Sequence, residues 1–238
     1  MSHTVFITGA SRGLGLELTR QFLDADSRVF AAAREPKSDT LQSLKSAHRS
    51  QLQLLSLDVT DNDQILKAAA TLAKQPLNVL INNAGLFLEN PFVGGPSENN
   101  ISTVNTDRWL TVFRVNTIAP LMLTRALRPN LKAGDRGTVA MISSLMGSLT
   151  NNHSGGAYSY RSSKAALNAT TVSLANDLVD DGIRVVALHP GWLQTDMGGS
   201  DAPLDVETSA KGLIAIMRNL EIEQSGCFFD HTGLSIAW

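Results

Sequence analysis

The chain contains a single cysteine, Cys227, among its 238 residues, which excludes an intrachain disulfide and fits a reducing compartment. It also lacks any apolar run approaching the ~18 residues of a membrane span. Its first residues do not show the basic region, long apolar stretch and cleavage site of a signal peptide. We therefore expect a cytoplasmic protein without stable membrane insertion.

An excess of one charge is absent as well. The 20 lysines and arginines and 22 acidic residues give a formal net charge of −2, and the positive residues are scattered. This excludes the basic footprint of a nucleic-acid-binding protein. No cluster has metal-ligand spacing, so we expect no metal site. Without an internal repeat or linker, and with 43% hydrophobic content, residues 1–238 are expected to form one domain.

The chain does contain a regular alternation of short apolar runs and longer helical patterns. This alternation predicts the α/β class, with a doubly wound parallel sheet of seven strands and helices on both faces. The expected strands are 5–8, 28–33, 51–57, 77–81, 138–142, 183–188 and 227–229. The expected helices are 14–24, 41–47, 61–74, 106–131, 157–179 and 205–220, with Asp61 as a cap and Pro120 bending the fourth. Loops 90–105, 149–156 and 198–203 are rich in Gly, Asn and Ser and are candidate site loops.

A glycine-rich turn separates the first expected strand from the first helix. Small residues let backbone N–H groups approach a pyrophosphate, and the helix N-terminus favours the anion. The spacing is Gly-x-x-x-Gly-x-Gly rather than Gly-x-Gly-x-x-Gly, so a turn without a ligand is the alternative. Its place in the α/β alternation favours a Rossmann-type dinucleotide site. The expected phosphate-binding residues are Gly9, Ser11, Arg12, Gly13, Leu14 and Gly15.

The end of the second strand bears on the choice of cofactor. Arg34 can donate two hydrogen bonds to a 2′-phosphate, and Arg12 can reach the same phosphate. NAD would require an acid near this point to bind the ribose hydroxyl, and Glu35 can supply one. Both arginines can alternatively be solvated surface residues. We favour NADP as the cofactor.

Further cofactor contacts are expected where the third and fourth strands end, because parallel sheets bind ligands at the carboxyl ends of their strands. Asp58 can hydrogen-bond an adenine amino group or simply begin the turn before Asp61. The Asn-rich segment after the fourth strand can be a ligand contact or an ordinary turn. The residues assigned to the cofactor here are Asp58, Val59, Asn83, Ala84 and Gly85.

Tyr160 and Lys164 are four residues apart, which places a phenol and an amine on one face of a helix. The reference pKa of tyrosine is about 10, and a nearby ammonium is expected to lower it. Tyr158 lies about 240° around the helix from Lys164, so Tyr160 is the better proton donor. Ser143 and Ser144 end the fifth strand facing opposite ways, so one of them is expected to point into the site.

Together these parts resemble the short-chain dehydrogenase/reductase family along nearly the whole chain. The motifs that carry the resemblance are Thr8-Gly9-x-x-x-Gly13-x-Gly15, Asp58, Asn82-Asn83-Ala84-Gly85, Asn116, Ser144, Tyr160-x-x-x-Lys164 and Pro190-Gly191. Finer features resemble sniffer-type carbonyl reductases and C-factor-like bacterial relatives. These features are 155–161, 189–192, 195–199 and 236–238.

The resemblance implies a catalytic tetrad of Asn116, Ser144, Tyr160 and Lys164. The spacing from Ser144 to Tyr160 is longer than usual in the family, so Ser148 is a minor alternative. The implied reaction is NADPH-dependent reduction of a small-molecule carbonyl compound. Tyr160 protonates the oxygen, Ser144 holds it, Lys164 lowers the tyrosine pKa and binds the nicotinamide ribose, and Asn116 supports a water relay. The expected nicotinamide contacts are Pro190, Gly191, Trp192, Leu193 and Thr195.

Other functions remain open at this point. One is NAD-dependent oxidation of an alcohol, and another is a nucleotide-binding signalling role, which the resemblance to C-factor permits. Related epimerases and dehydratases share Tyr-x-x-x-Lys, but they need a substantial second domain for the substrate, and 238 residues leave no room for one. An apolar or aromatic substrate is expected from a pocket lined by Leu86, Leu145, Met146, His153, Trp192 and Met197. Each of these can alternatively be an ordinary core residue, and His153 is expected to be a loop residue rather than a second acid. The resemblance implies a homodimer, or a homotetramer, through the helices bearing Asn116 and Tyr160. Residues 195–200 can form a lid or a rigid turn.

Overall fold

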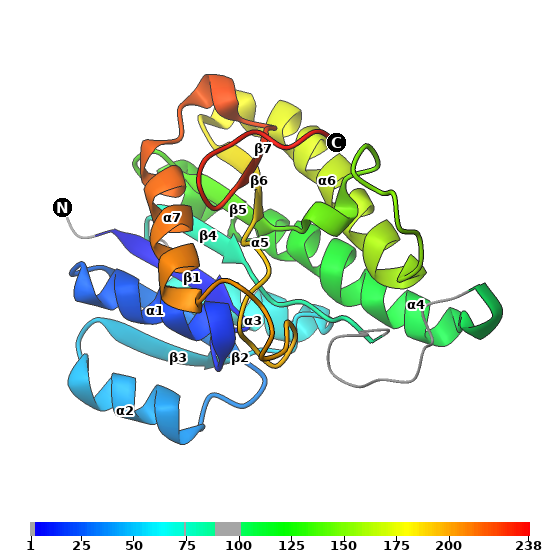
Figure 1. Ribbon diagram of the computed structural model, residues 1–238. Coiled ribbons are helices and arrows are strands. Elements are labelled where there is room, and N and C mark those ends of the chain that lie inside the picture. Colours follow the sequence, from blue (N-terminus) through cyan, green and yellow to red (C-terminus); the bar gives the residue numbers. More distant parts are fainter. Residues whose placement is uncertain (1–2, 74, 89–100) are drawn as a thin grey trace.

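A seven-stranded parallel sheet is the centre of the fold (Figure 1). The computed structural model describes residues 3–73, 75–88 and 101–238. The strand order is β3-β2-β1-β4-β5-β6-β7, and every neighbouring pair is parallel. The strands are β1 (Thr4–Thr8), β2 (Arg28–Ala33), β3 (Leu52–Ser56), β4 (Val79–Asn82), β5 (Thr138–Ile142), β6 (Arg184–His189) and β7 (Phe228–Asp230). The predicted α/β class and doubly wound parallel sheet are confirmed.

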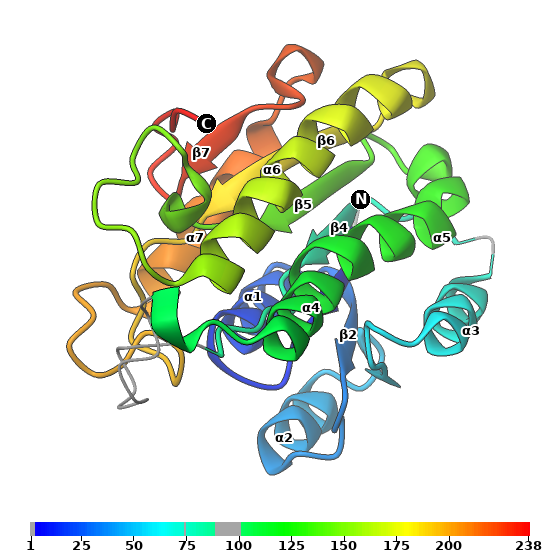
Figure 2. The same ribbon diagram turned by 90° about the vertical axis from the view of Figure 1, so that its right-hand side faces the viewer.

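Helices cover both faces of the sheet because successive strand residues point to opposite sides. In β1, Val5 and Ile7 enter one hydrophobic cluster with residues of α1, α2 and α7. Phe6 enters a second cluster with residues of α3, α5 and α6. Figure 2 shows α4, α5 and α6 together on this second side. The helices are α1 (Gly13–Asp24), α2 (Asp39–Ala47), α3 (Asn62–Leu72), α4 (Thr106–Phe113), α5 (Ala119–Ala133), α6 (Tyr158–Leu178) and α7 (Val206–Asn219).

The direction in which the sheet is built changes between β1 and β4. From β1 the chain winds outward through β2 to β3, and then returns to place β4 on the other side of β1. The turns that leave these two neighbouring strands therefore diverge to opposite faces. Such a switch point is where open α/β sheets bind their ligands.

The expected long helix over 106–131 is interrupted before Pro120 rather than bent at it. A π-helical segment, Arg114–Ile118, separates α4 from α5. Pro120 lies in the first turn of α5, where a missing N–H is tolerated. Single π turns inside helices occur frequently at functional sites. This one contains Asn116.

The remaining predicted boundaries lie within a few residues of the observed ones. Asp61 caps α3 as predicted, since its carboxylate accepts the N–H groups of Asp63 and Gln64 at 2.9 and 3.1 Å. The predicted end of that helix at Lys74 and most of candidate loop 90–105 lie outside the described residues. No helix in the described part of the chain is long and apolar enough to cross a membrane.

Candidate functional site

The glycine turn after β1 is fastened to the segment after β4. The Thr8 hydroxyl oxygen accepts the backbone N–H groups of Asn83 and Ala84, both at 3.0 Å. In return, the side-chain amide of Asn83 donates to the carbonyls of Thr8 and Gly9 at 2.9 and 3.2 Å. The side chain of Asn83, which the sequence assigns to the cofactor, shapes the turn in this structure, and its contact with a cofactor stays a prediction. Nothing in the sequence indicated that the Thr8 hydroxyl would bind the segment after β4, although Thr8 is the first residue of the glycine motif.

Backbone geometry explains the glycines of this turn. Gly9 and Gly13 have φ of +65° and +52°, a region that glycine adopts without strain. A Cβ at Gly15 would lie 2.2 Å from the carbonyl oxygen of Gly9, so a side chain there would force the turn open. The turn is thus built for a close approach of backbone to backbone, and α1 starts immediately after it.

The N-terminus of α1 is well suited to an anion. Its N-cap, Arg12, makes no side-chain cap hydrogen bond, and its first turn holds no acidic residue. By contrast, α3 and α7 are capped by the carboxylates of Asp61 and Asp205. Uncapped N–H groups at a helix start need an acceptor, and a phosphate oxygen supplies one. The residues present therefore fit the pyrophosphate of a dinucleotide.

The expected adenine and ribose side of the site lies at the ends of β2 and β3. Arg34 is exposed directly after β2. Asp58 accepts two hydrogen bonds from Thr60, at 2.7 and 2.9 Å, and its carbonyl accepts the N–H of Asp61. Asp58 therefore does begin a turn, as the simpler interpretation expected.

Tyr160 and Lys164 are both buried in the first turns of α6, at 8% and 4% exposure. The Lys164 ammonium donates to the carbonyl of Ile142, the last residue of β5, at 2.7 Å, and lies 5.7 Å from the centre of the Tyr160 ring. The Ser144 side chain is hydrogen-bonded to Tyr160. A phenol, a hydroxyl and an amine thus meet at the carboxyl end of β5.

Burial sets the protonation of these groups. It raises the pKa of Tyr160 to about 12, although the hydrogen bond from Ser144 opposes the shift. It lowers the pKa of Lys164 to about 8. The sequence expectation that Lys164 lowers the tyrosine pKa is therefore wrong for this structure, because loss of water outweighs any attraction between the two groups. Tyr160 keeps its proton at neutral pH, as a proton donor must.

The structure separates the competing side chains. Ser143 donates to Asn168 on α6 at 2.6 Å, away from the phenol. Ser148, the minor alternative to Ser144, donates to the carbonyl of Ala237 at 2.6 Å and so ties down the C-terminal segment. Tyr158 is exposed while Tyr160 is buried, in line with the helical geometry that favoured Tyr160. Of these serines, only Ser144 is in contact with the Tyr160 phenol.

The side chain of Asn116 is fully engaged within the protein. Its Oδ1 accepts the N–H of Leu86 at 2.8 Å, and its Nδ2 donates to the Leu86 carbonyl and to Ser163 at 2.9 and 3.0 Å. Ser163 in turn donates to the carbonyl of Tyr160 at 2.7 Å. The amide thus joins the segment after β4 to α6, and a water relay through this side chain is not what the geometry favours.

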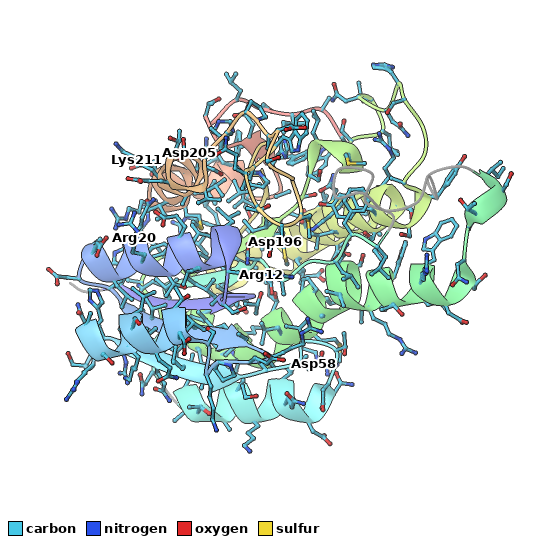
Figure 3. The ribbon with its side chains drawn as sticks, turned by 60° about the horizontal axis from the view of Figure 1, so that its bottom comes forward. Arg12, Arg20, Asp58, Asp196, Asp205 and Lys211 are labelled. Atoms are coloured by element: carbon cyan, nitrogen blue, oxygen red, sulfur yellow. The ribbon has the colours of Figure 1, made fainter. Side chains whose placement is uncertain are left out.

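The segment between β6 and α7 closes one side of the glycine turn. Gly191 has φ of +89°, and a Cβ there would lie 2.6 Å from Leu204. Thr195 packs against Gly13, since a Cβ at Gly13 would lie 3.3 Å from its methyl carbon. Arg12 bonds Asp196 across the same junction at 2.7 Å (Figure 3). Pro190, Trp192 and Leu193 lead into this junction, so the segment expected to bind the nicotinamide does adjoin the phosphate turn.

Known proteins show the same sequence pattern and fold. The sequence model of the short chain dehydrogenase family matches residues 3–203. The chain belongs to the short-chain dehydrogenase/reductase family. It is 42% identical over 170 residues to the C-signal protein of Myxococcus xanthus, covering 71% of this chain and 98% of that protein.

Among solved structures, the Sniffer carbonyl reductase of D. melanogaster is 35% identical, with a TM-score of 0.91 over all of both chains. The NADPH-bound carbonyl reductase from chicken fatty liver is also 35% identical, with a TM-score of 0.90, covering 100% of this chain and 99% of that one. The predicted family, with its sniffer-like and C-factor-like relatives, is therefore confirmed. This short-chain dehydrogenase/reductase is thus a member of an oxidoreductase family.

Three further observations concern the surroundings of the site in this dehydrogenase/reductase and the rest of the described surface. Phe87, which sequence reasoning passed over in favour of Leu86, stacks on the Tyr160 ring with centroids 4.2 Å apart. The only available signal was an aromatic residue shortly after the Asn-rich motif. Among the described residues, no group of three or more His, Cys, Asp or Glu side chains could hold a metal ion. A hollow between α1 and α7 is lined by Arg20, Gln21, Asp24, Ala25, Glu207 and Lys211.

The expected substrate-pocket residues are a mixed set. Leu145, Trp192 and Met197 are exposed although large and apolar, as residues that line an open site are. His153 is exposed in the loop before α6. The Trp192 indole donates to the Gly198 carbonyl at 2.7 Å, which fixes its ring relative to the glycine pair.

Proposed function

We propose that the chain, as a single domain of residues 1–238, is an NADPH-dependent carbonyl reductase. The observation that carries this proposal is the buried contact of Ser144 with the Tyr160 phenol, one helical turn from Lys164. Both NADP-bound and carbonyl-reducing proteins are among its structural neighbours. An apolar or aromatic small-molecule carbonyl compound is the proposed substrate, since Leu145, Trp192 and Met197, which are expected to line the substrate site, are large, apolar and exposed.

NADPH would be held along the switch-point edge of the sheet. The glycine turn and the first N–H groups of α1 would take the pyrophosphate, and Arg12 and Arg34 the 2′-phosphate. When bound, the cofactor supplies the hydride that a carbonyl carbon accepts. The other proposed contacts are Ser11, Leu14, Asp58, Val59, Ala84, Gly85, Pro190, Gly191, Trp192, Leu193 and Thr195.

The proton comes from the protein. Tyr160 would donate its phenolic proton to the substrate oxygen as that oxygen becomes an alcohol, and Ser144 would hold the oxygen in line with the phenol. Lys164 would bind the nicotinamide ribose with its ammonium group. Its pKa of about 8 leaves it mostly charged at neutral pH, so it can also return a proton towards the phenolate.

We assign the proton relay to the backbone of Asn116 rather than to its side chain. The amide is occupied by Leu86 and Ser163. The carbonyl of Asn116, however, would be bonded in a regular helix by the N–H of residue 120, and Pro120 has none. Pro120 thus removes the usual i+4 donor, and this carbonyl would accept a water that leads to Lys164.

Tyr160→Phe tests the proposal directly, because it removes the proton donor and keeps the ring. NADPH reduction of a panel of aromatic ketones and aldehydes should fall by at least ~10²-fold, while NADPH still binds. Tyr158→Phe is the matched control and should reduce normally. Normal turnover by Tyr160→Phe would remove Tyr160 from this role. NADPH binding with no turnover of any carbonyl by the unmodified protein would favour the alternative, a nucleotide-binding signalling role.

We further propose that the protein acts in the cytoplasm as a homodimer. Apolar side chains are exposed along α4, the π-helical segment with Asn116 and α5, and along α6 and just after its end: Leu110, Ile118, Leu121, Val172 and Val179. Burying such side chains against a second copy is favourable, at roughly 25 cal/mol per Å². Light scattering should give twice the monomer mass, and introducing Arg at Leu121 and Val172 should give the monomer mass. A tetramer is the alternative outcome for the unmodified chain.

A further inference from the structure

The face of the Tyr160 phenol ring is covered by an aromatic side chain from another part of the fold. Phe87 comes from the segment after β4, and Tyr160 from the start of α6. Their rings are stacked with centroids 4.2 Å apart and an interplanar angle of 18°. Phe87 is itself half-buried. One face of the proton donor is therefore shielded by carbon rather than by water.

The segment that carries Phe87 is tied to the backbone of Tyr160 by a chain of hydrogen bonds. Asn116 binds both the N–H and the carbonyl of Leu86, which precedes Phe87, at 2.8 and 2.9 Å. Asn116 also donates to Ser163, and Ser163 donates to the carbonyl of Tyr160. Asn116 and Ser163 therefore fix the backbone next to Phe87 relative to the backbone of Tyr160, and this positions the two rings for their contact.

Stacking against a fixed ring has two physical consequences for a phenol. It restricts rotation of the Tyr160 ring, so that the hydroxyl stays directed at Ser144. It also excludes water from the ring, and burial is the cause that raises the pKa of Tyr160 to about 12. A donor that must be protonated and correctly aimed benefits from both.

We propose that Phe87 is a positioning residue for the reduction, which orients the Tyr160 phenol and keeps it in its protonated, water-excluded state. This inference rests on the proposed reductase function, but its physical core does not depend on turnover. The ring of Phe87 acts through Tyr160, and no contact of Phe87 with substrate is needed.

The chain offers a direct optical test because it contains only two tyrosines. In a Tyr158→Phe background, Tyr160 is the sole tyrosine, and its phenolate can be followed by ultraviolet absorbance as pH rises. Phe87→Ala should lower the pKa of this phenol by about one unit or more, towards the reference value of about 10. It should also lower kcat about tenfold while changing the Kd for NADPH less than about twofold.

Two variants sharpen the test. Phe87→Leu keeps an apolar cover but loses the flat ring, so it should retain most of the raised pKa and still lose kcat. Leu88→Ala, at the exposed next residue, should change neither quantity. Far-ultraviolet circular dichroism confirms that each variant is folded.

An unchanged phenol titration and unchanged kcat in folded Phe87→Ala would overturn the proposal. An unchanged phenol titration in Phe87→Ala would overturn the shielding of Tyr160 whatever happens to kcat, because removal of the whole side chain must admit water. A loss of kcat in Leu88→Ala equal to that in Phe87→Ala would overturn the positioning role, since the effect would not be specific to the stacked ring. If instead Tyr160→Phe reduces carbonyls normally, the proposed reductase mechanism fails. The titration still reports separately whether Phe87 shields Tyr160.

Discussion

Arg12 in the glycine turn and Asp196 after β6 form an ion pair of 2.7 Å across 184 positions of sequence. Figure 3 shows the two residues next to each other, between the start of α1 and the segment that leads to α7. Both side chains are 74% exposed, so the pair contributes little to stability. Its position is more informative, because Arg12 is also a proposed ligand of the cofactor 2′-phosphate. A carboxylate and a phosphate would compete for the same guanidinium.

Asp196→Asn should therefore bind NADPH more tightly than the unmodified protein. An exposed ion pair is worth at most about 1 kcal/mol, so the expected gain is up to about fivefold in Kd. Affinity for NADH should stay unchanged because NADH has no 2′-phosphate. Fluorescence titration with both cofactors measures this. Equal gains for the two cofactors would show that Asp196 acts on the loop and not through competition for Arg12.

Arg34→Ala should weaken the binding of NADPH much more than the binding of NADH. The Kd for NADPH should rise by roughly tenfold or more, as expected for the loss of one charge-assisted phosphate contact. The residue is exposed directly after β2, so salt should screen its attraction for the phosphate. The difference between variant and unmodified protein should accordingly shrink as salt is raised in the titration. Lys37→Ala, another exposed cation close by in sequence, is the matched control. An equal loss of affinity for both cofactors would instead show that Arg34 has a structural role.

The stability contributed by position 164 should depend on pH. Burial lowers the pKa of Lys164 from 10.5 to about 8, so between these values the unfolded chain binds more protons than the native one. The free energy of unfolding then rises with pH across this window, by at most about 3 kcal/mol. Lys164→Met removes the effect.

Urea unfolding of both proteins at about pH 7.5 and about pH 9.5 measures the difference. The unmodified protein should gain stability relative to Lys164→Met at the higher pH. A constant difference would mean that Lys164 titrates normally. The raised pKa of Tyr160 acts in the opposite direction, but only above about pH 10, where the unfolded chain loses its phenolic proton first.

Hydrogen exchange across residues 192–206 should distinguish a lid from a rigid turn. Gly198 and Gly199 both donate to the Thr195 carbonyl, at 3.1 and 2.8 Å, so the segment is a hydrogen-bonded turn in this conformation. A lid requires fast exchange in the free protein and clear protection when NADPH binds. Slow exchange that NADPH leaves unchanged would establish the rigid turn. Asp196→Asn should speed exchange in the free protein if the Arg12 contact holds the segment closed.

Local patterns in the sequence were sufficient for the fold and the set of reactive groups. The strand and helix alternation is a property of short segments, and it predicted the parallel sheet. The spacing of Tyr160 and Lys164 follows from helix geometry alone. Asp61 could be predicted as a cap because capping involves residues at most three apart. The glycine turn likewise lies within a few residues of the helix that it precedes.

The tertiary structure decided which groups meet and what state they are in. Ser144 is preferred over the other two serines because Ser143 is hydrogen-bonded to Asn168 and Ser148 to Ala237. Both partners are far away in sequence. The direction of the Tyr160 pKa shift depends on burial, which is the sum of contacts from several elements and has no local sequence signal.

The same holds for the ring contact of Phe87 and for the ion pair of Arg12. The sequence by itself therefore determined the fold class and the reactive side chains that the chain contains, because these patterns involve residues close together in the chain. Only the folded arrangement determined the orientation, partners and protonation of each group, because these depend on distances between segments that the sheet brings together.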